Sequence, residues 1–174
     1  MKEMWDLYDR NRNMLERKAE RGTKLSDDEY HLVSNAWIRN SEGKFLISQR
    51  VEGKSHPLMW ECTGGSAIMG EDTYKCAIRE AKEELGIEIS NAPYAFVGST
   101  IRYHKNCPDI LDVYIFGYYV PLEKVTIQKE EVNDVKWATK DEILELYNNG
   151  KFETTEFFMD AINFNSELNN PIDI

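Results

Sequence analysis

The chain has 174 residues, 41% of them hydrophobic and 30% charged, which is an ordinary composition for a single globular domain. Its formal net charge of -10 argues against a nonspecific nucleic-acid surface and against an anionic-membrane surface, because both require a basic patch. The three cysteines have no metal-ligand spacing, the N-terminus has no apolar signal core, and no apolar run reaches membrane-spanning length, so we expect a reduced, cytoplasmic protein.

The first part of the chain is predicted to form an extension followed by a hairpin. Residues 1–28 are polar and rich in both charge signs, and we expect part of this N-terminal extension to form a short strand or hairpin. Strand-forming and turn-forming residues then alternate. They predict, in order, a strand at 30–38, a turn at 40–43, a strand at 44–50, a loop at 51–59 and a short strand at 60–63.

Segment 65–87 has the pattern of a loop followed by a helix. Asp72 or Thr73 can cap the first free amides, and apolar residues then recur at helical spacing. Gly86 stands where a left-handed C-terminal cap belongs. The segment therefore predicts a helix from about residue 72 to residue 85.

Three glutamates on this helix, Glu80, Glu83 and Glu84, are spaced by three and four residues. Side chains at these spacings share one helix face, where like charges repel and destabilise an isolated helix. Such a cluster requires a counter-charge, and a hard divalent cation prefers carboxylate oxygens. The spacing therefore predicts a metal site on the helix.

The rest of the chain predicts more strands than helices. Thr139 begins a capping sequence for one helix, and an apolar stripe marks another near the C-terminus. Because the strands outnumber the helices, the helices are expected to cover the faces of a sheet. The predicted elements are strands at 94–103, 112–120 and 132–138, a continuation of the sheet at 125–127, and helices at about 139–147 and 154–164.

The helix segment also fits a known signature, G-x5-E-x7-R-E-U-x-E-E-x-G-U, in which U is apolar. It resembles the signature of the Nudix hydrolases, and the resemblance extends from about residue 30 to residue 147. The resemblance implies an α+β protein, an α/β/α sandwich around a central mixed sheet, with residues 1–174 as one Nudix domain and 65–87 as its Nudix box. The matching residues are Gly65, Glu71, Arg79, Glu80, Ala81, Glu83, Glu84, Gly86 and Ile87.

The resemblance implies a metal-dependent hydrolase that cleaves a diphosphate linkage in a nucleoside diphosphate linked to another moiety. The expected cofactor is Mg²⁺, with Mn²⁺ as the alternative, and the expected partner is a small-molecule diphosphate; whether the chain forms a homodimer stays open. Glu80, Glu83 and Glu84 are the implied metal ligands, and Glu83 and Glu84 also count as catalytic. Arg79 is implied to pair with Glu71 and hold the loop against the helix, with Gly65 and Gly86 as structural support.

The general base and the substrate contacts are less sharply defined by the sequence. Relatives supply the base from the motif or from a later loop, where Glu131 is the first candidate and Glu130 the second. The candidate substrate-binding residues are His31, Arg50, Lys54 and Glu130.

Two other functions are compatible with this scaffold, an isomerase and a binding module without catalysis. The flanks around His31 and Glu131 resemble isopentenyl-diphosphate isomerase, but that enzyme has a cysteine before the motif glycine and a histidine after it. This chain has Gly64 and Ser66 there, and Cys62 is two residues too early, so we expect no isomerase activity. A binding module without catalysis would be expected to have damaged motif carboxylates, and here all of them are present.

Overall fold

A mixed eight-stranded sheet organises the computed structural model, which describes residues 2–166, 168 and 172–173. At its centre β3 and β8 run parallel, in register from His31 opposite Asp109 to Arg39 opposite Gly117. The β-branched and aromatic residues of β8 are buried along almost its whole length, as expected for a central strand. The strands are β3 (His31–Arg39), β4 (Phe45–Arg50), β5 (Trp60–Glu61), β6 (Thr63–Ser66), β7 (Tyr94–Arg102), β8 (Asp109–Tyr119), β9 (Val132–Ala138) and β10 (Ile172–Asp173).

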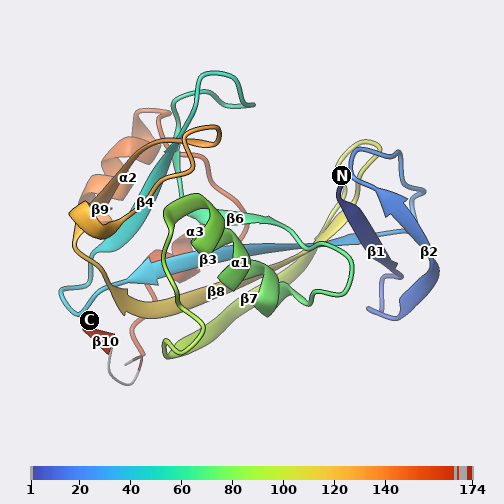
Figure 1. The fold of residues 1–174 in the computed structure, drawn as a ribbon, viewed down its shortest axis with the longest axis horizontal. Coiled ribbons are helices and arrows are strands. Elements are labelled where there is room, and N and C mark those ends of the chain that lie inside the picture. Colours follow the sequence, from blue (N-terminus) through green and yellow to red (C-terminus); the bar gives the residue numbers. More distant parts are fainter. Residues whose placement is uncertain (1, 167, 169–171, 174) are drawn as a thin grey trace.

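A helical layer covers each face of the sheet (Figure 1). Helix α1 (Thr73–Leu85) packs on one face, and α2 (Lys140–Asn148) and α3 (Phe158–Ile162) pack on the other. Successive residues of a strand point to opposite faces, so Ala36 joins the α1 core whereas Trp37 joins the core of α2 and α3. The predicted α/β/α sandwich with a mixed sheet is confirmed.

The predicted caps fix both ends of α1. The Asp72 side chain accepts a hydrogen bond of 2.8 Å from the Lys75 amide at the first turn. Gly86 ends the helix with a φ of 67°, in the left-handed region that favours glycine. The helix predicted for residues 72–85 is therefore confirmed.

Two other predicted elements differ from the structure. Residues 125–127 do not extend the sheet, because the Thr126 amide instead donates to the Leu85 carbonyl at 3.0 Å, at the end of α1. The last carbonyls of a helix have no partner within the helix, and this loop supplies one. The predicted helix at 154–164 is shortened to α3, because Phe157 has a φ of 62° and interrupts it.

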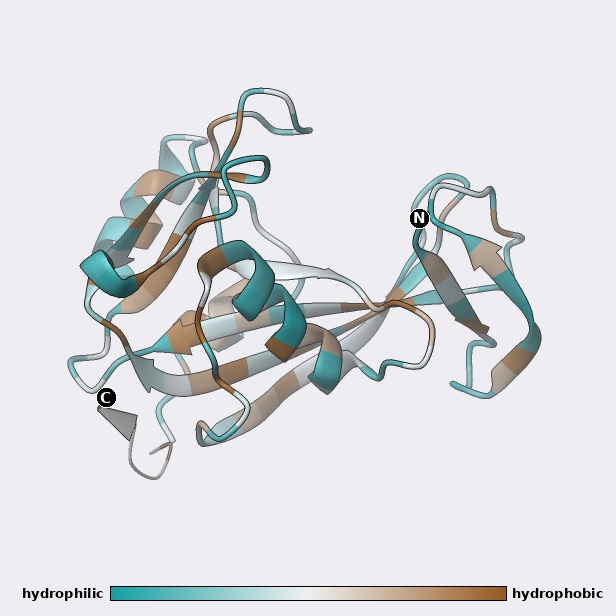
Figure 2. Cartoon of the chain, in the orientation of Figure 1, coloured by the Kyte–Doolittle hydropathy of each residue, from teal (hydrophilic) through white to brown (hydrophobic). Residues whose placement is uncertain are grey.

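The N-terminal extension contains the expected hairpin, formed by β1 (Met4–Tyr8) and β2 (Met14–Glu20). It lies at the end of the molecule to which β3 and β8 lead (Figure 1). Hydrophobic positions concentrate on the central strands and hydrophilic ones on much of α1 and on the loops (Figure 2). The hairpin has a small core of its own, made by Trp5, Leu7, Ala19 and Leu25.

Among the residues that the structure describes, no helix combines the length and the apolar character that a membrane-spanning segment requires. A small 3₁₀ turn at Leu122–Lys124 completes the regular structure between β8 and β9.

Candidate active site

The acidic face of α1 opens onto a cavity of about 380 Å³. Because α1 is fixed by its caps and its apolar stripe, Glu80, Glu83 and Glu84 are held on the side that faces this space. Four other parts of the chain complete the wall: the N-terminal segment, the end of β4 with the loop after it, β6, and the loop before β9. The lining residues are Glu3, Arg21, Arg50, Lys54, Ser55, Gly64, Gly65, Arg79, Glu80, Glu83, Glu84, Gln128 and Glu131.

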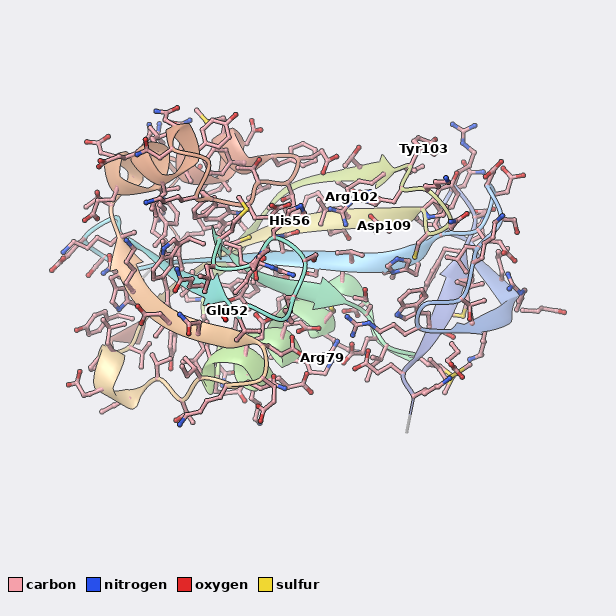
Figure 3. The ribbon with its side chains drawn as sticks, turned by 90° about the horizontal axis from the view of Figure 1, so that it is seen from above. Glu52, His56, Arg79, Arg102, Tyr103 and Asp109 are labelled. Atoms are coloured by element: carbon pink, nitrogen blue, oxygen red, sulfur yellow. The ribbon has the colours of Figure 1, made fainter. Side chains whose placement is uncertain are left out.

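Arg79 joins the motif loop to the helix. Its Nε lies 2.9 Å from the Glu71 carboxylate, so the predicted pairing is present. Its Nη1 lies 2.9 Å from Glu80 and 2.8 Å from Glu83, and its Nη2 donates to the Ser66 carbonyl at 3.0 Å. Burial lowers the pKa of Arg79, but the hydrogen bonds to Glu71 and the charge of Glu80 raise it by more. This guanidinium therefore stays charged. Figure 3 labels Arg79 beside α1.

Gly65 leaves the space that the Glu80 carboxylate occupies. The side chain of Glu80 packs directly over this glycine, and a Cβ atom at position 65 would overlap its carboxylate oxygens. Burial raises the pKa of Glu80, while the neighbouring Arg79 opposes that shift. The close contact at position 65 is therefore with the Glu80 carboxylate, and the backbone φ of Gly65 is not in the left-handed region.

Glu84 is the most buried of the three helix glutamates, with 6% of the residue exposed. Within the described part of the chain, its carboxylate forms no hydrogen bond or ion pair, whereas Arg79 contacts both Glu80 and Glu83. Burial, together with the charges of Glu80 and Glu61, raises the pKa of Glu84 well above the ordinary value. Burying an ionised carboxylate costs free energy, and a nearby positive charge offsets that cost.

The three helix glutamates have the donor chemistry that a hard divalent cation prefers. No three acidic, histidine or cysteine side chains among the described residues converge as a preformed metal site, however. Arg79 explains this arrangement, because its guanidinium already lies between Glu80 and Glu83 and neutralises their repulsion. The residues therefore fit a divalent cation in chemistry and position, and a cation held between Glu80 and Glu83 would replace a contact of Arg79 with one of them.

The remaining predicted site residues divide into two groups. Arg50, Lys54 and Glu131 line the cavity, and Lys54 forms an ion pair with Glu131. Glu130, the second candidate for the base, is exposed and outside the lining. Lys54 belongs to the loop that carries Glu52 and His56 in Figure 3, so this loop brings a cation toward the motif helix.

His31 lies away from the cavity, contrary to its place among the candidate substrate contacts. Its ring stacks on Trp5 with centroids 4.0 Å apart, and its Nε2 lies 3.4 Å from Cys107 Sγ. Burial lowers the pKa of His31 to about 4, which keeps the imidazole neutral. This residue therefore secures the N-terminal hairpin to β3.

Sequence reasoning missed Glu61 and the two hairpin residues of the lining, Glu3 and Arg21. Both Arg50 Nη1 contacts to the Glu61 carboxylate are short, at 2.9 and 2.7 Å, and Arg50 Nε donates to the Ser55 carbonyl at 2.7 Å. Glu61 lies four residues before Gly65, so its closeness to the motif in the sequence was a signal that could have found it. Glu3 and Arg21 lie far from the motif in sequence, and only the docked hairpin brings them to it.

Comparison with known families shows the family to which the chain belongs. The model of the NUDIX domain matches residues 29–158. The chain belongs to the Nudix family. The uncharacterised Nudix hydrolase lmo0368 of Listeria monocytogenes is 37% identical over 153 residues, which cover 86% of this chain and 88% of that protein. CTP pyrophosphohydrolase of Escherichia coli is 29% identical over 110 residues, covering 63% of this chain and 77% of that protein.

Solved structures agree on the fold. DR0079 of Deinococcus radiodurans superposes with a TM-score of 0.71 at 22% identity, covering 89% of this chain and 94% of that one. A MutT protein of Methanosarcina mazei superposes with a TM-score of 0.58 at 24% identity, covering 76% and 89%. This Nudix protein is thus a hydrolase of diphosphate bonds in small molecules, from a family whose members generally use divalent metals.

Proposed function

We propose that this Nudix hydrolase cleaves the diphosphate linkage of a nucleoside diphosphate joined to another moiety, with Mg²⁺ or Mn²⁺ as cofactor. One observation carries the proposal: the same cavity is lined by the three helix glutamates, by Glu131 and by cations. Carboxylates supply metal ligands and a base, and the cations supply contacts to phosphate oxygens.

The chain's own residues have separable roles in this proposal. Glu80, Glu83 and Glu84 would hold the cation, which when bound neutralises phosphate charge and lowers the pKa of water. Glu131 accepts the proton of the attacking water, and Lys54 fixes the orientation of that carboxylate. A bond forms between the water oxygen and phosphorus, the bridging P–O bond breaks, and its electron pair leaves with the departing phosphate group.

We infer that the chain belongs to a branch of the family whose flanking sequence resembles that of isopentenyl-diphosphate isomerases. The enzyme of Citrobacter koseri is 27% identical over 125 residues, covering 69% of this chain and 68% of that protein. Isomerase chemistry receives no support from Cys62. This thiol is buried, accepts a hydrogen bond of 3.0 Å from Asn35 Nδ2, and has its pKa raised by burial to about 12.

A substrate panel tests the proposed reaction. Nucleoside triphosphates including CTP, dinucleotides, nucleotide sugars and isopentenyl diphosphate are incubated with Mg²⁺ or Mn²⁺ in ¹⁸O-labelled water, and the products are identified by mass spectrometry. CTP is included because a relative is named for it. We expect label in one phosphate product of at least one nucleoside diphosphate derivative. Isomerisation of isopentenyl diphosphate, or no turnover of any compound, would overturn the proposal.

Glu83→Gln separates a role in turnover from a role in folding. Because it removes a metal ligand, we expect turnover of the best panel substrate to fall about 100-fold or more. Its thermal stability should be nearly unchanged, since Glu83 is half exposed and the variant relieves repulsion. Glu88→Gln is the matched control, because Glu88 lies outside the cavity and its carboxylate contacts the exposed Lys82 and the Ser90 amide. Equal activity of Glu83→Gln and Glu88→Gln would refute the role.

A further inference from the structure

The N-terminal hairpin is attached to the loop of the Nudix motif. The Met69 amide donates to the Met4 carbonyl at 2.7 Å, and the Gly70 amide donates to Asp6 Oδ2 at 2.7 Å. Both donors precede α1 by only a few residues. The first strand of the hairpin is therefore held in a fixed relation to the motif helix.

A second attachment holds the turn of the hairpin. Arg12, at a φ of 63°, directs its guanidinium onto both oxygens of Asp112 on β8, with Nη1 3.0 Å from Oδ2. Its Nη2 also donates to Ser99 Oγ at 2.6 Å. Asp112 is 2% exposed, so this ion pair connects the hairpin to the buried part of the central sheet. The hairpin is thus fixed along its length.

These attachments place Arg21 at the catalytic cavity. Arg21 follows β2 directly, its amide donates to the Glu3 carbonyl at 2.9 Å, and both side chains belong to the lining that contains Glu80 and Glu83. The side chain of Arg21 is 57% exposed. A cation from a segment outside the motif therefore faces the space where phosphates are expected.

The partners of Arg21 differ from those of the other cations in the lining. Arg79 is bound by motif carboxylates, Arg50 by Glu61, and Lys54 by Glu131. Arg21 pairs with Glu3 at 2.6 Å, and both side chains are exposed. An exposed ion pair contributes little to stability, so exchanging Glu3 for a phosphate group costs little. A guanidinium also suits phosphate oxygens, which it binds in a bidentate manner.

We propose that Arg21 binds the phosphate chain of the substrate, so that the N-terminal hairpin forms part of the substrate site. The inference rests on the proposed diphosphate chemistry of the cavity. Arg21 is then a substrate-binding residue that is absent from the Nudix motif and is supplied by the segment before the matched domain. In the free enzyme Glu3 holds the guanidinium in place until phosphate replaces it.

Binding of imidodiphosphate, which hydrolyses poorly, tests this role in the full chain with Mg²⁺ present. Titration calorimetry of Arg21→Ala should show about tenfold weaker binding, which corresponds to the loss of one charge-assisted contact. Arg21→Lys should recover part of this loss, because it keeps the charge without the fork of donors. Arg17→Ala is the control, since Arg17 is a half-exposed arginine of the same hairpin that pairs with the partly buried Glu29 and lies outside the lining.

Kinetics on the best panel substrate give a second measurement. Arg21→Ala should raise KM about tenfold while kcat changes less than twofold, and its melting temperature should match that of Arg17→Ala. Glu3→Gln should bind imidodiphosphate as tightly as the wild type or more tightly, because it removes the competing carboxylate. Unchanged binding in Arg21→Ala, or no binding to the wild type, would overturn the proposal. If turnover fails but binding depends on Arg21, only the proposed reaction is refuted.

Discussion

Two partly buried arginines, Arg79 and Arg102, which Figure 3 labels, differ in the carboxylates around them. Arg102 forms a bidentate pair with the buried Asp109, at 2.7 and 2.9 Å, and its Nη1 also lies 4.0 Å from the exposed Glu156. Arg79 instead contacts the carboxylates of Glu71, Glu80 and Glu83, and the nearby Glu84 has no hydrogen-bond or ion-pair partner among the residues that the structure describes. The Arg102 pair is nearly balanced by itself, whereas the Arg79 cluster has an excess of negative charge that a further cation can neutralise.

The largest test of this difference removes each arginine in turn. Arg79→Ala and Arg102→Ala should each lower the free energy of unfolding by about 3–5 kcal/mol, because each leaves buried carboxylates without a counter-charge. Mg²⁺ should restore part of the stability of Arg79→Ala, since a divalent cation can replace the lost charge between Glu80 and Glu83. Urea unfolding with and without Mg²⁺ measures both effects.

Arg102→Ala serves as the control for general effects of the salt. This variant leaves Asp109 beside His104 Nε2, at 3.6 Å, rather than within a cluster of converging carboxylates, so Mg²⁺ should change its free energy of unfolding by no more than the increment seen in the wild type. An equal gain from Mg²⁺ in both variants, beyond that increment, would show that the two clusters do not differ in the way proposed.

The protonation of Glu84 provides a smaller test. Burial, Glu80 and Glu61 raise the pKa of Glu84 in the folded protein above its ordinary value of 4.5, so the folded state holds this proton more tightly than the unfolded chain does. The contribution of Glu84 to stability is therefore favourable at acidic pH and is lost as pH rises through the raised pKa. Glu84→Gln removes this dependence.

Unfolding in EDTA at several pH values measures that dependence. We expect the free energy of unfolding of Glu84→Gln, relative to wild type, to become more favourable from pH 4 to pH 8. Burial also raises the pKa of Asp109, although Arg102 opposes the shift, so a decline of the same sign remains in the variant. A constant difference between Glu84→Gln and wild type across this range would contradict the assigned environment of Glu84.

The sequence predicted the motif region well because its signals are local. Asp72 and Gly86 cap α1 as expected, and the three glutamates share the predicted face, since helical spacing alone determines both features. The prediction was wrong for residues 125–127, because the bond between Thr126 and Leu85 joins two segments that sequence patterns treat separately.

The long-range part of the site could not be predicted for the same reason. Arg21 has no local signal, and its position depends on Arg12 reaching Asp112, a pair separated by 100 residues. The isomerase-like flank led to the prediction that His31 contacts the substrate. In the structure its ring stacks on Trp5, so it lies beneath the hairpin. Tertiary docking of the extension decides both outcomes.

The smallest expected effect is on the stability of variants at the adjacent glycines Gly64 and Gly65. Gly64 tests backbone packing, and Gly65 tests the position of the Glu80 carboxylate. A Cβ atom at Gly64 would overlap the backbone carbonyl of Ser34, which cannot rotate away, so Gly64→Ala should cost about 1–3 kcal/mol of stability. A Cβ atom at Gly65 would overlap only the end of the Glu80 side chain, which can move. Gly65→Ala should therefore cost less than about 1 kcal/mol.

The displaced carboxylate should nevertheless affect the charge cluster. Moving Glu80 weakens its contact with Arg79 and removes one implied metal ligand, so we expect Gly65→Ala to lose much of the stabilisation that Mg²⁺ gives the wild type. Gly64→Ala should keep that stabilisation despite its lower starting stability. Melting curves over a range of Mg²⁺ concentrations distinguish the two. An intact Mg²⁺ response in Gly65→Ala would mean that the acidic cluster binds its cation without Glu80, through Glu83 and Glu84.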